Sequence, residues 1–148
     1  MEKEFDSKNI KYFEKLLSHN DHIIRTRAVC ILAEIAIEDA VTPISSVLKE
    51  DDDELVRHEA AFSLGQLGYN SAIDALSLAV KNDPSFFVRH EAAIALGVIG
   101  SEMARSILNQ ALEDPHEEVR KSADVAIANL DYINHVKRIN KFTKLTGG

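Results

Sequence analysis

Two His-Glu pairs are the residues of this chain whose types and spacing could do chemistry. His58-Glu59 lies in the segment VRHEAAFSLGQLG, and His90-Glu91 lies 32 residues later in VRHEAAIALGVIG, with nine of the thirteen positions identical. Two imidazoles and a neighbouring carboxylate offer two nitrogens and one oxygen, a set that suits a non-heme iron that activates oxygen. Zinc or manganese would accept the same ligand types. The pattern therefore predicts that His58, Glu59, His90 and Glu91 bind a metal.

The competing interpretation of these pairs is structural. A glutamate near a helix start is favoured by the helix dipole without any metal, and a histidine on an open face can simply be solvated. Two fainter copies of the same segment carry Thr26-Arg27 and Lys121-Ser122 at the corresponding places. Because the apolar frame persists there without the pair, the fold does not require His-Glu, and this favours the metal interpretation.

Helical repeats must position these residues. Arginines recur at intervals of 32, 32 and 31 residues, each beside an apolar row that steps by 4, 4 and 3 along one face of an α-helix. The four are Arg25, Arg57, Arg89 and Arg120. We expect them to tie the repeats together through Asp side chains or backbone carbonyls. Second helices follow near 40–49, 71–82 and 101–113. Such hairpins bury their apolar stripes only by stacking, so the sequence predicts an all-α fold, an α-solenoid of about four helical hairpin repeats.

Turn and cap residues set the expected boundaries. We expect one domain over 1–148, with repeats near 23–53, 54–85, 86–115 and 116–145 and an N-terminal capping helix at 7–18. Gly68 and Gly100 fall just past a helix end, where a left-handed residue is wanted. On a helical wheel His58 and His90 point away from the core. Gly65 and Gly97 lie on the histidine side, which predicts room for a ligand there.

Bulk composition limits the possible partners. The formal net charge of −7 argues against nucleic acid and against an acidic membrane surface. There is no signal peptide and no apolar run of membrane-spanning length. Cys30 is the only cysteine, which excludes a disulfide within one chain and fits a reducing compartment; we expect it to be a buried thiol. These features predict a cytoplasmic protein with no nucleic-acid and no membrane partner.

The two His-Glu segments resemble the motifs of the deoxyhypusine hydroxylases, a family of HEAT-repeat enzymes. That family has two halves of four repeats, and the middle two repeats of each half carry His-Glu. The order here, Thr-Arg, His-Glu, His-Glu, Lys-Ser, matches one half from 23 to about 132. The resemblance implies HEAT-like repeats, a di-iron centre, dioxygen as co-substrate and a lysine-derived side chain on a protein as substrate. It makes His58 and His90 iron ligands, and it divides Glu59 and Glu91 between iron ligation and holding the cationic substrate, as catalytic residues.

The chain differs from that family in having two His-Glu motifs where the enzyme has four. A homodimer whose His-Glu faces meet would restore the full set. We therefore predict a dimeric, iron-dependent monooxygenase related to deoxyhypusine hydroxylase, acting on a basic protein that carries a modified lysine. Two alternatives from another class stay open: a non-catalytic HEAT-repeat scaffold for protein–protein interaction, and a chromophore-binding module of the HEAT-like lyase type.

Overall fold

The computed structural model describes residues 1–146, with side chains described to residue 141, and this part of the chain is entirely helical between its turns. The α-helices are α1 (Glu2–Asp6), α2 (Ile10–Leu16), α3 (His22–Ile35), α4 (Val41–Glu50), α5 (Glu54–Leu67), α6 (Ile73–Asn82), α7 (Phe86–Ile99), α8 (Arg105–Ala111) and α9 (Glu117–Thr146). Short 3-10 turns, η1 (Ile37–Ala40), η2 (Asn70–Ala72) and η3 (Glu102–Ala104), lead into α4, α6 and α8. Within residues 1–146 no helix is both long enough and apolar enough to cross a membrane.

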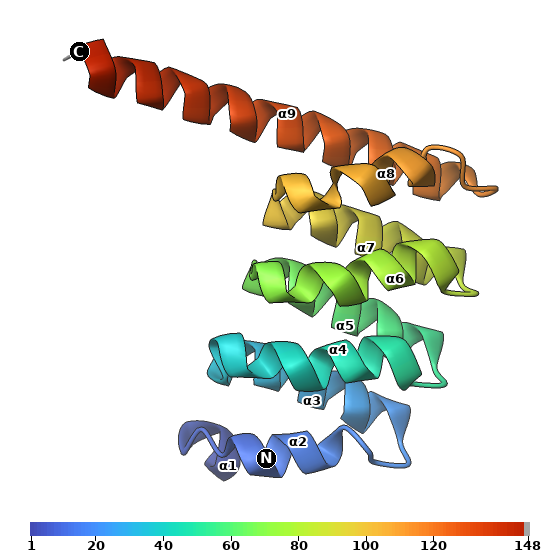
Figure 1. The fold of residues 1–148 in the computed structure, drawn as a ribbon. Coiled ribbons are helices and arrows are strands. Elements are labelled where there is room, and N and C mark those ends of the chain that lie inside the picture. The colour runs from blue at the N-terminus through green and yellow to red at the C-terminus, as the bar shows by residue number, and fades with distance from the viewer. Residues whose placement is uncertain (147–148) are drawn as a thin grey trace.

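The helices stack as hairpins into a solenoid, which confirms the predicted fold class (Figure 1). The first helices of the repeats, α3, α5 and α7, form one layer, and the second helices, α4, α6 and α8, form the other (Figure 1). Asp53 begins α5 as its N-cap, because its carboxylate accepts hydrogen bonds from the backbone N–H groups of Leu55 and Val56. Gly68 and Gly100 end α5 and α7 with φ of 75° and 70°, the left-handed conformation predicted from the sequence.

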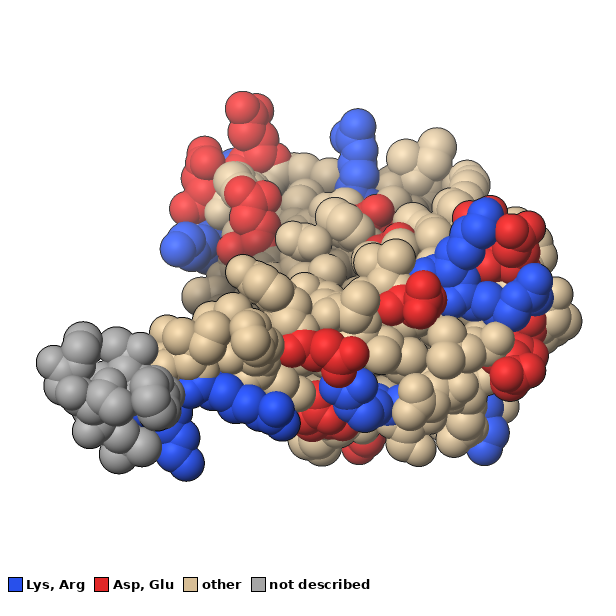
Figure 2. Space-filling view, turned by 90° about the horizontal axis from the view of Figure 1, so that it is seen from above, with Lys and Arg blue, Asp and Glu red and all other residues tan. Residues whose placement is uncertain are grey.

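The fourth segment is a single helix rather than a hairpin. Asp131 stands 31 residues after Gly100, at the place where a glycine would end the helix, and it binds Arg105 at 2.7 Å instead. Neither glycine nor proline occurs between residues 117 and 146, so α9 continues beyond the stack (Figure 1). Its projecting part carries only basic charge, visible as blue side chains next to the grey end in Figure 2. The surface charge is therefore uneven, with a basic helix attached to an acidic body.

Close helix contacts in the first layer depend on two glycines. A Cβ on Gly65 would lie 2.8 Å from Ala95 Cβ, and a Cβ on Gly97 would lie 2.8 Å from both Cα and Cβ of Ala126. Both distances are far below van der Waals contact, so only glycine lets α5, α7 and α9 pack this closely. The predicted ligand space at Gly65 and Gly97 is therefore wrong. A helix wheel places these glycines on the histidine side, but a neighbouring helix fills that space.

An arginine–aspartate ladder runs along the turns between repeats. The first three arginines each donate two hydrogen bonds to an aspartate in the turn that follows the next helix, at distances of 2.8 to 3.2 Å: Arg25 to Asp51, Arg57 to Asp83, and Arg89 to Asp114. The same arginines also donate to backbone carbonyls five and six residues before them. Arg120 closes the ladder with carbonyl contacts to Asp114 and Pro115. The predicted role of the arginines is confirmed.

Candidate metal centre

The second turns of α5 and α7 present the two His-Glu pairs, and the structure joins them across the repeats rather than within them. The Nε2 atom of His58 lies 3.3 Å from Oε2 of Glu91, which belongs to the next repeat. The side chains are 24% and 11% exposed, so this contact sits at the edge of the buried interior. Consecutive residues on a helix point about 100° apart. The histidine therefore faces outward while the glutamate of the following repeat reaches back to it.

The separation of His58 and Glu91 fits a shared metal ion. Two ligands at about 2.1 Å from one metal, at angles of about 90° to 110°, lie about 3.0 to 3.4 Å apart. The observed 3.3 Å falls within that range and is longer than the common N–H···O hydrogen bond. The ring of Phe87 stacks on His58 with a centroid distance of 4.0 Å and an interplanar angle of 9°, which restrains the imidazole plane. One nitrogen and one carboxylate oxygen are thus held at ligand spacing.

His90 continues the same pattern with a different partner. Its Nδ1 atom lies 2.6 Å from Oγ of Ser122, which occupies the position of the missing glutamate in the fourth segment. Ser122 is 6% exposed, and its hydroxyl donates a hydrogen bond to the backbone carbonyl of Glu118 at 2.7 Å. His90 is thus held through one ring nitrogen.

Glu59 has its contacts on the opposite side, in α3 and its own helix. Cys30 donates from Sγ to Glu59 Oε1 at 3.1 Å, and Ser63 donates from Oγ to the same oxygen at 3.4 Å. Cys30 was expected to be buried, but it is exposed, because position 30 lies off the core stripe on the side of Glu59. Although the residue is exposed, neighbouring atoms partly shield its sulfur from water, and this desolvation, followed by the hydrogen bond to Glu59 and its charge, raises the pKa of the Cys30 thiol to about 12. The thiol is therefore protonated at neutral pH and serves as a hydrogen-bond donor.

The residues whose side chains are described, 1–141, do not complete a metal site within one chain. Among the residues whose side chains are described, no three His, Cys, Asp or Glu side chains converge as a ligand group. The structure brings His58 and Glu91 together and leaves His90 and Glu59 with other partners. Sequence reasoning missed Ser122, which it treated only as evidence that the pair was absent. The signal that could have identified Ser122 is its separation of 32 residues from His90, which equals the repeat period.

Exposed apolar side chains surround the candidate residues. Leu55 precedes His58 by three residues and is 53% exposed, while Phe62 follows it by four and is 45% exposed. Residues three or four positions apart share a helix face, so both lie on the side of the histidine. Val125 is 68% exposed and holds the place in α9 that Phe62 holds in α5. The histidine face is therefore apolar around a few polar groups.

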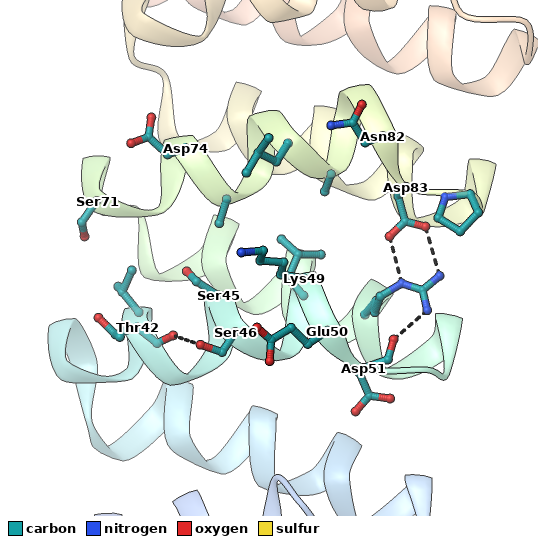
Figure 3. Close-up of a pocket in the computed structure, with 17 residues that line it drawn as sticks. Thr42, Ser45, Ser46, Lys49, Glu50, Asp51, Ser71, Asp74, Asn82 and Asp83 are labelled. Atoms are coloured by element: carbon teal, nitrogen blue, oxygen red, sulfur yellow. Dashed lines mark hydrogen bonds and ion pairs between the residues drawn. The ribbon is translucent and has the colours of Figure 1, made fainter.

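A cavity of about 750 Å³ lies elsewhere, between α4 and α6 (Figure 3). Its lining includes the apolar side chain of Leu78, and none of the four candidate metal ligands lines it. Ser45 and Lys49 of α4 and Asp74 of α6 border it (Figure 3). The Oγ atom of Ser45 is buried without a hydrogen-bond partner. This cavity has the size and mixed lining of a site for a small ligand or a peptide.

Comparisons with known proteins agree with this architecture. Residues 10–97 and 73–145 match a family model described as HEAT repeats. The structure of human deoxyhypusine hydroxylase in complex with glycerol is similar with a TM-score of 0.77 and 28% identity, over 83% of this chain and 43% of that chain. A designed armadillo repeat protein in complex with the peptide (KR)4 gives a TM-score of 0.61 at 25% identity, over 96% of this chain and 77% of that chain.

Phycocyanin lyase from Nostoc sp. PCC7120, solved as the complex of CpcE and CpcF, has a TM-score of 0.59 at 21% identity, over 82% of this chain and 64% of that chain. At that identity the likeness shows a shared fold alone. No curated protein sequence matches the chain.

The similarity to deoxyhypusine hydroxylase confirms the resemblance predicted from the two His-Glu segments. The chain spans less than half the length of that human enzyme chain. The family model, in contrast, matches nearly the whole sequence, in two overlapping segments. The chain belongs to the family of HEAT-repeat proteins.

Proposed function

We propose that this chain is an iron-dependent oxygenase related to deoxyhypusine hydroxylase, which hydroxylates a lysine-derived side chain and completes its di-metal site by dimerisation. The observation that carries the proposal is the 3.3 Å approach of His58 Nε2 to Glu91 Oε2 between neighbouring repeats. It occurs in a chain that is 28% identical to the human hydroxylase over 83% of its length. Neither residue is needed by the helical core, since other repeats lack both.

His58 and Glu91 hold the metal in this proposal. Their ligand spacing supports the choice of Glu91 over Glu59, which the sequence left open. His90 does not form a group of three with His58 and Glu91 within one chain, so in this proposal it offers its Nε2 atom to a metal shared with the partner chain, since Ser122 occupies the other ring nitrogen. When bound, iron supplies the redox chemistry that activates dioxygen. The chain's part is to fix the ligands and to line their surroundings with apolar side chains that exclude water.

Glu59 holds the cationic substrate in this proposal. Cys30 and Ser63 direct one of its oxygens, and neither is a cation that would neutralise it. A carboxylate held by neutral donors attracts an ammonium group and can orient the neighbouring C–H bond. In the reaction, one atom of dioxygen enters that C–H bond and the other leaves as water. Two electrons and two protons come from an external two-electron reductant.

A second copy of the chain completes the site. The chain spans 43% of the human enzyme, and its described residues form no group of three metal ligands. Exposed Leu55, Phe62 and Phe87 beside the histidines are suited to burial against a partner. In a two-fold dimer both copies present the same patch to the interface, so the donor number doubles. We place this dimer in the cytoplasm, where the single thiol of Cys30 stays reduced.

Hydroxylation tests the proposal directly. The iron-loaded protein is incubated with dioxygen, a reductant and a peptide that carries a polyamine-modified lysine, and mass spectrometry follows the gain of one oxygen atom. We expect oxygen transfer, and we expect Glu59→Gln to raise the KM for the cationic peptide with metal binding retained. Glu38→Gln, a matched change of an exposed glutamate in η1, is the control and should leave the reaction unchanged. Absence of oxygen transfer by the iron-loaded dimer would contradict the proposal.

The cavity between α4 and α6 supports a second candidate, a non-catalytic peptide-binding scaffold. Asp74 and Glu50 border this cavity, and the designed armadillo protein of similar fold is bound to the basic peptide (KR)4. Calorimetric titration with a Lys/Arg-rich peptide distinguishes this candidate. Binding that is lost in Asp74→Asn and kept in His58→Ala would favour the scaffold, and binding that needs His58 would favour the hydroxylase site.

A further inference from the structure

We propose that Ser122 is a positioning residue that holds His90 in the tautomer with its proton on Nδ1, so that Nε2 presents a lone pair to a metal ion. The inference concerns the hydrogen bonding of the metal-free chain. It rests on the proposed function only for its purpose, the preparation of His90 as a ligand.

The direction of the hydrogen bond follows from counting protons. The hydroxyl of Ser122 has one hydrogen, and its geometry directs that hydrogen to the carbonyl of Glu118 at 2.7 Å. The same oxygen lies 2.6 Å from His90 Nδ1 and must then accept. A neutral imidazole has one N–H group, so a donating Nδ1 leaves Nε2 unprotonated.

The opposite tautomer makes fewer hydrogen bonds. With the proton on Nε2, the Ser122 hydroxyl would have to turn to Nδ1 and abandon Glu118. One hydrogen bond would then replace two. Ser122 is 6% exposed, so water has little access to repair the loss. The buried serine therefore selects one tautomer, as the second partner of a metal-binding histidine commonly does.

The position of Ser122 in the repeats supports a specific role. It stands at the glutamate position of the fourth segment, and its contact with His90 parallels the contact of Glu91 with His58. The two histidines are thereby used differently. His58 meets a carboxylate through Nε2, whereas His90 is anchored through Nδ1 and keeps Nε2 open.

Nitrogen-15 NMR on the metal-free protein tests the inference. Long-range proton–nitrogen correlation spectra are recorded at a pH where the ring is neutral, and His90→Gln assigns the signals. We expect a protonated Nδ1 and an unprotonated Nε2 in the wild type and in Ser122→Thr, which keeps the hydroxyl. In Ser122→Ala the proton should shift to Nε2 in a substantial fraction of molecules. A wild-type spectrum with the proton on Nε2, or an unchanged tautomer in Ser122→Ala, would overturn the inference.

Metal titration separates this inference from the proposed function. Anaerobic addition of ferrous iron should show an affinity about 10- to 100-fold lower for Ser122→Ala than for the wild type, with Ser122→Thr close to the wild type. Equal affinities in all three proteins would overturn the positioning role. If the wild type has the Nδ1–H tautomer but binds no metal, the proposed function fails and the assignment of the hydrogen bond stands.

Discussion

Removal of Arg57 is the most informative perturbation of the fold. Its guanidinium donates to both carboxylate oxygens of Asp83 at 2.9 and 3.1 Å and to the carbonyls of Asp51 and Asp52 at 2.9 and 3.3 Å. The hydrogen bond to Asp83 is the main reason that the pKa of Arg57 is raised above its ordinary value. Replacement by leucine preserves most of the apolar stem and removes all four hydrogen bonds.

The expected loss follows from burial. The side chains of Arg57 and Asp83 are 10% and 5% exposed, so Arg57→Leu leaves a buried carboxylate without its counter-ion. Breaking one side of such a pair costs about 3–5 kcal/mol. Arg120→Leu provides a matched control at the end of the ladder, because Arg120 binds only carbonyls and its removal strands no carboxylate. The control should cost about 1.5–3 kcal/mol, the value of hydrogen bonds that involve a charged group.

Urea denaturation followed by circular dichroism at neutral pH measures both losses. The double variant Arg57→Leu/Asp83→Asn should regain about 1–2 kcal/mol over the single variant, since the amide keeps an acceptor for the Ser85 N–H and carries no charge. The reasoning is refuted if Arg57→Leu costs no more than Arg120→Leu, or if the Asp83→Asn change adds a further loss.

Three further predictions concern packing and pH. Leu96 is fully buried between repeats, so Leu96→Ala should lower the unfolding free energy by about 2–5 kcal/mol in urea, and a loss below about 1 kcal/mol would mean that the core is misassigned. Gly65→Ala should destabilise by about 1–2 kcal/mol in the same assay, because the 2.8 Å clash with Ala95 outweighs a helix-propensity gain of about 1 kcal/mol; a stabilised variant would contradict the close contact. Burial would raise the pKa of Asp114, but hydrogen bonds from Arg89 and a backbone N–H lower it overall. Its stabilisation is therefore present above the unfolded-state pKa of about 3.9 and is lost as pH falls through the lower folded-state value. The decrease of the urea midpoint on acidification should be smaller for Asp114→Asn than for the wild type.

The repeat period was sufficient to predict the stack. The apolar rows depend on spacing within one helix and the arginines on the repeat period, and a sequence displays both directly. Gly68 and Gly100 were equally readable, because a helix end needs a left-handed residue. The fourth segment was less clear, since its continuation as α9 depends on Asp131 replacing a glycine. Local rules therefore accounted for the frame of the solenoid.

Contacts between helices could not be read in the same way. The sequence places His58 beside Glu59, but the fold pairs it with Glu91, because side chains adjacent on a helix diverge. Gly65 faces Ala95 rather than an open space, which only the crossing of two helices determines. Ser122 and Cys30 complete contacts whose partners lie about one repeat away. Their residue types alone gave no sign of this role.

Solution mass during anaerobic iron titration tests the central claim most directly. Sedimentation of the wild type, His58→Ala and the matched surface variant Asp74→Asn is compared with and without ferrous iron, together with the bound iron per chain. We predict one iron per chain in a dimer for the wild type and for Asp74→Asn, with loss of iron and a weaker dimer for His58→Ala. A wild-type protein that stays monomeric with iron bound, or that binds no iron at all, would contradict the account.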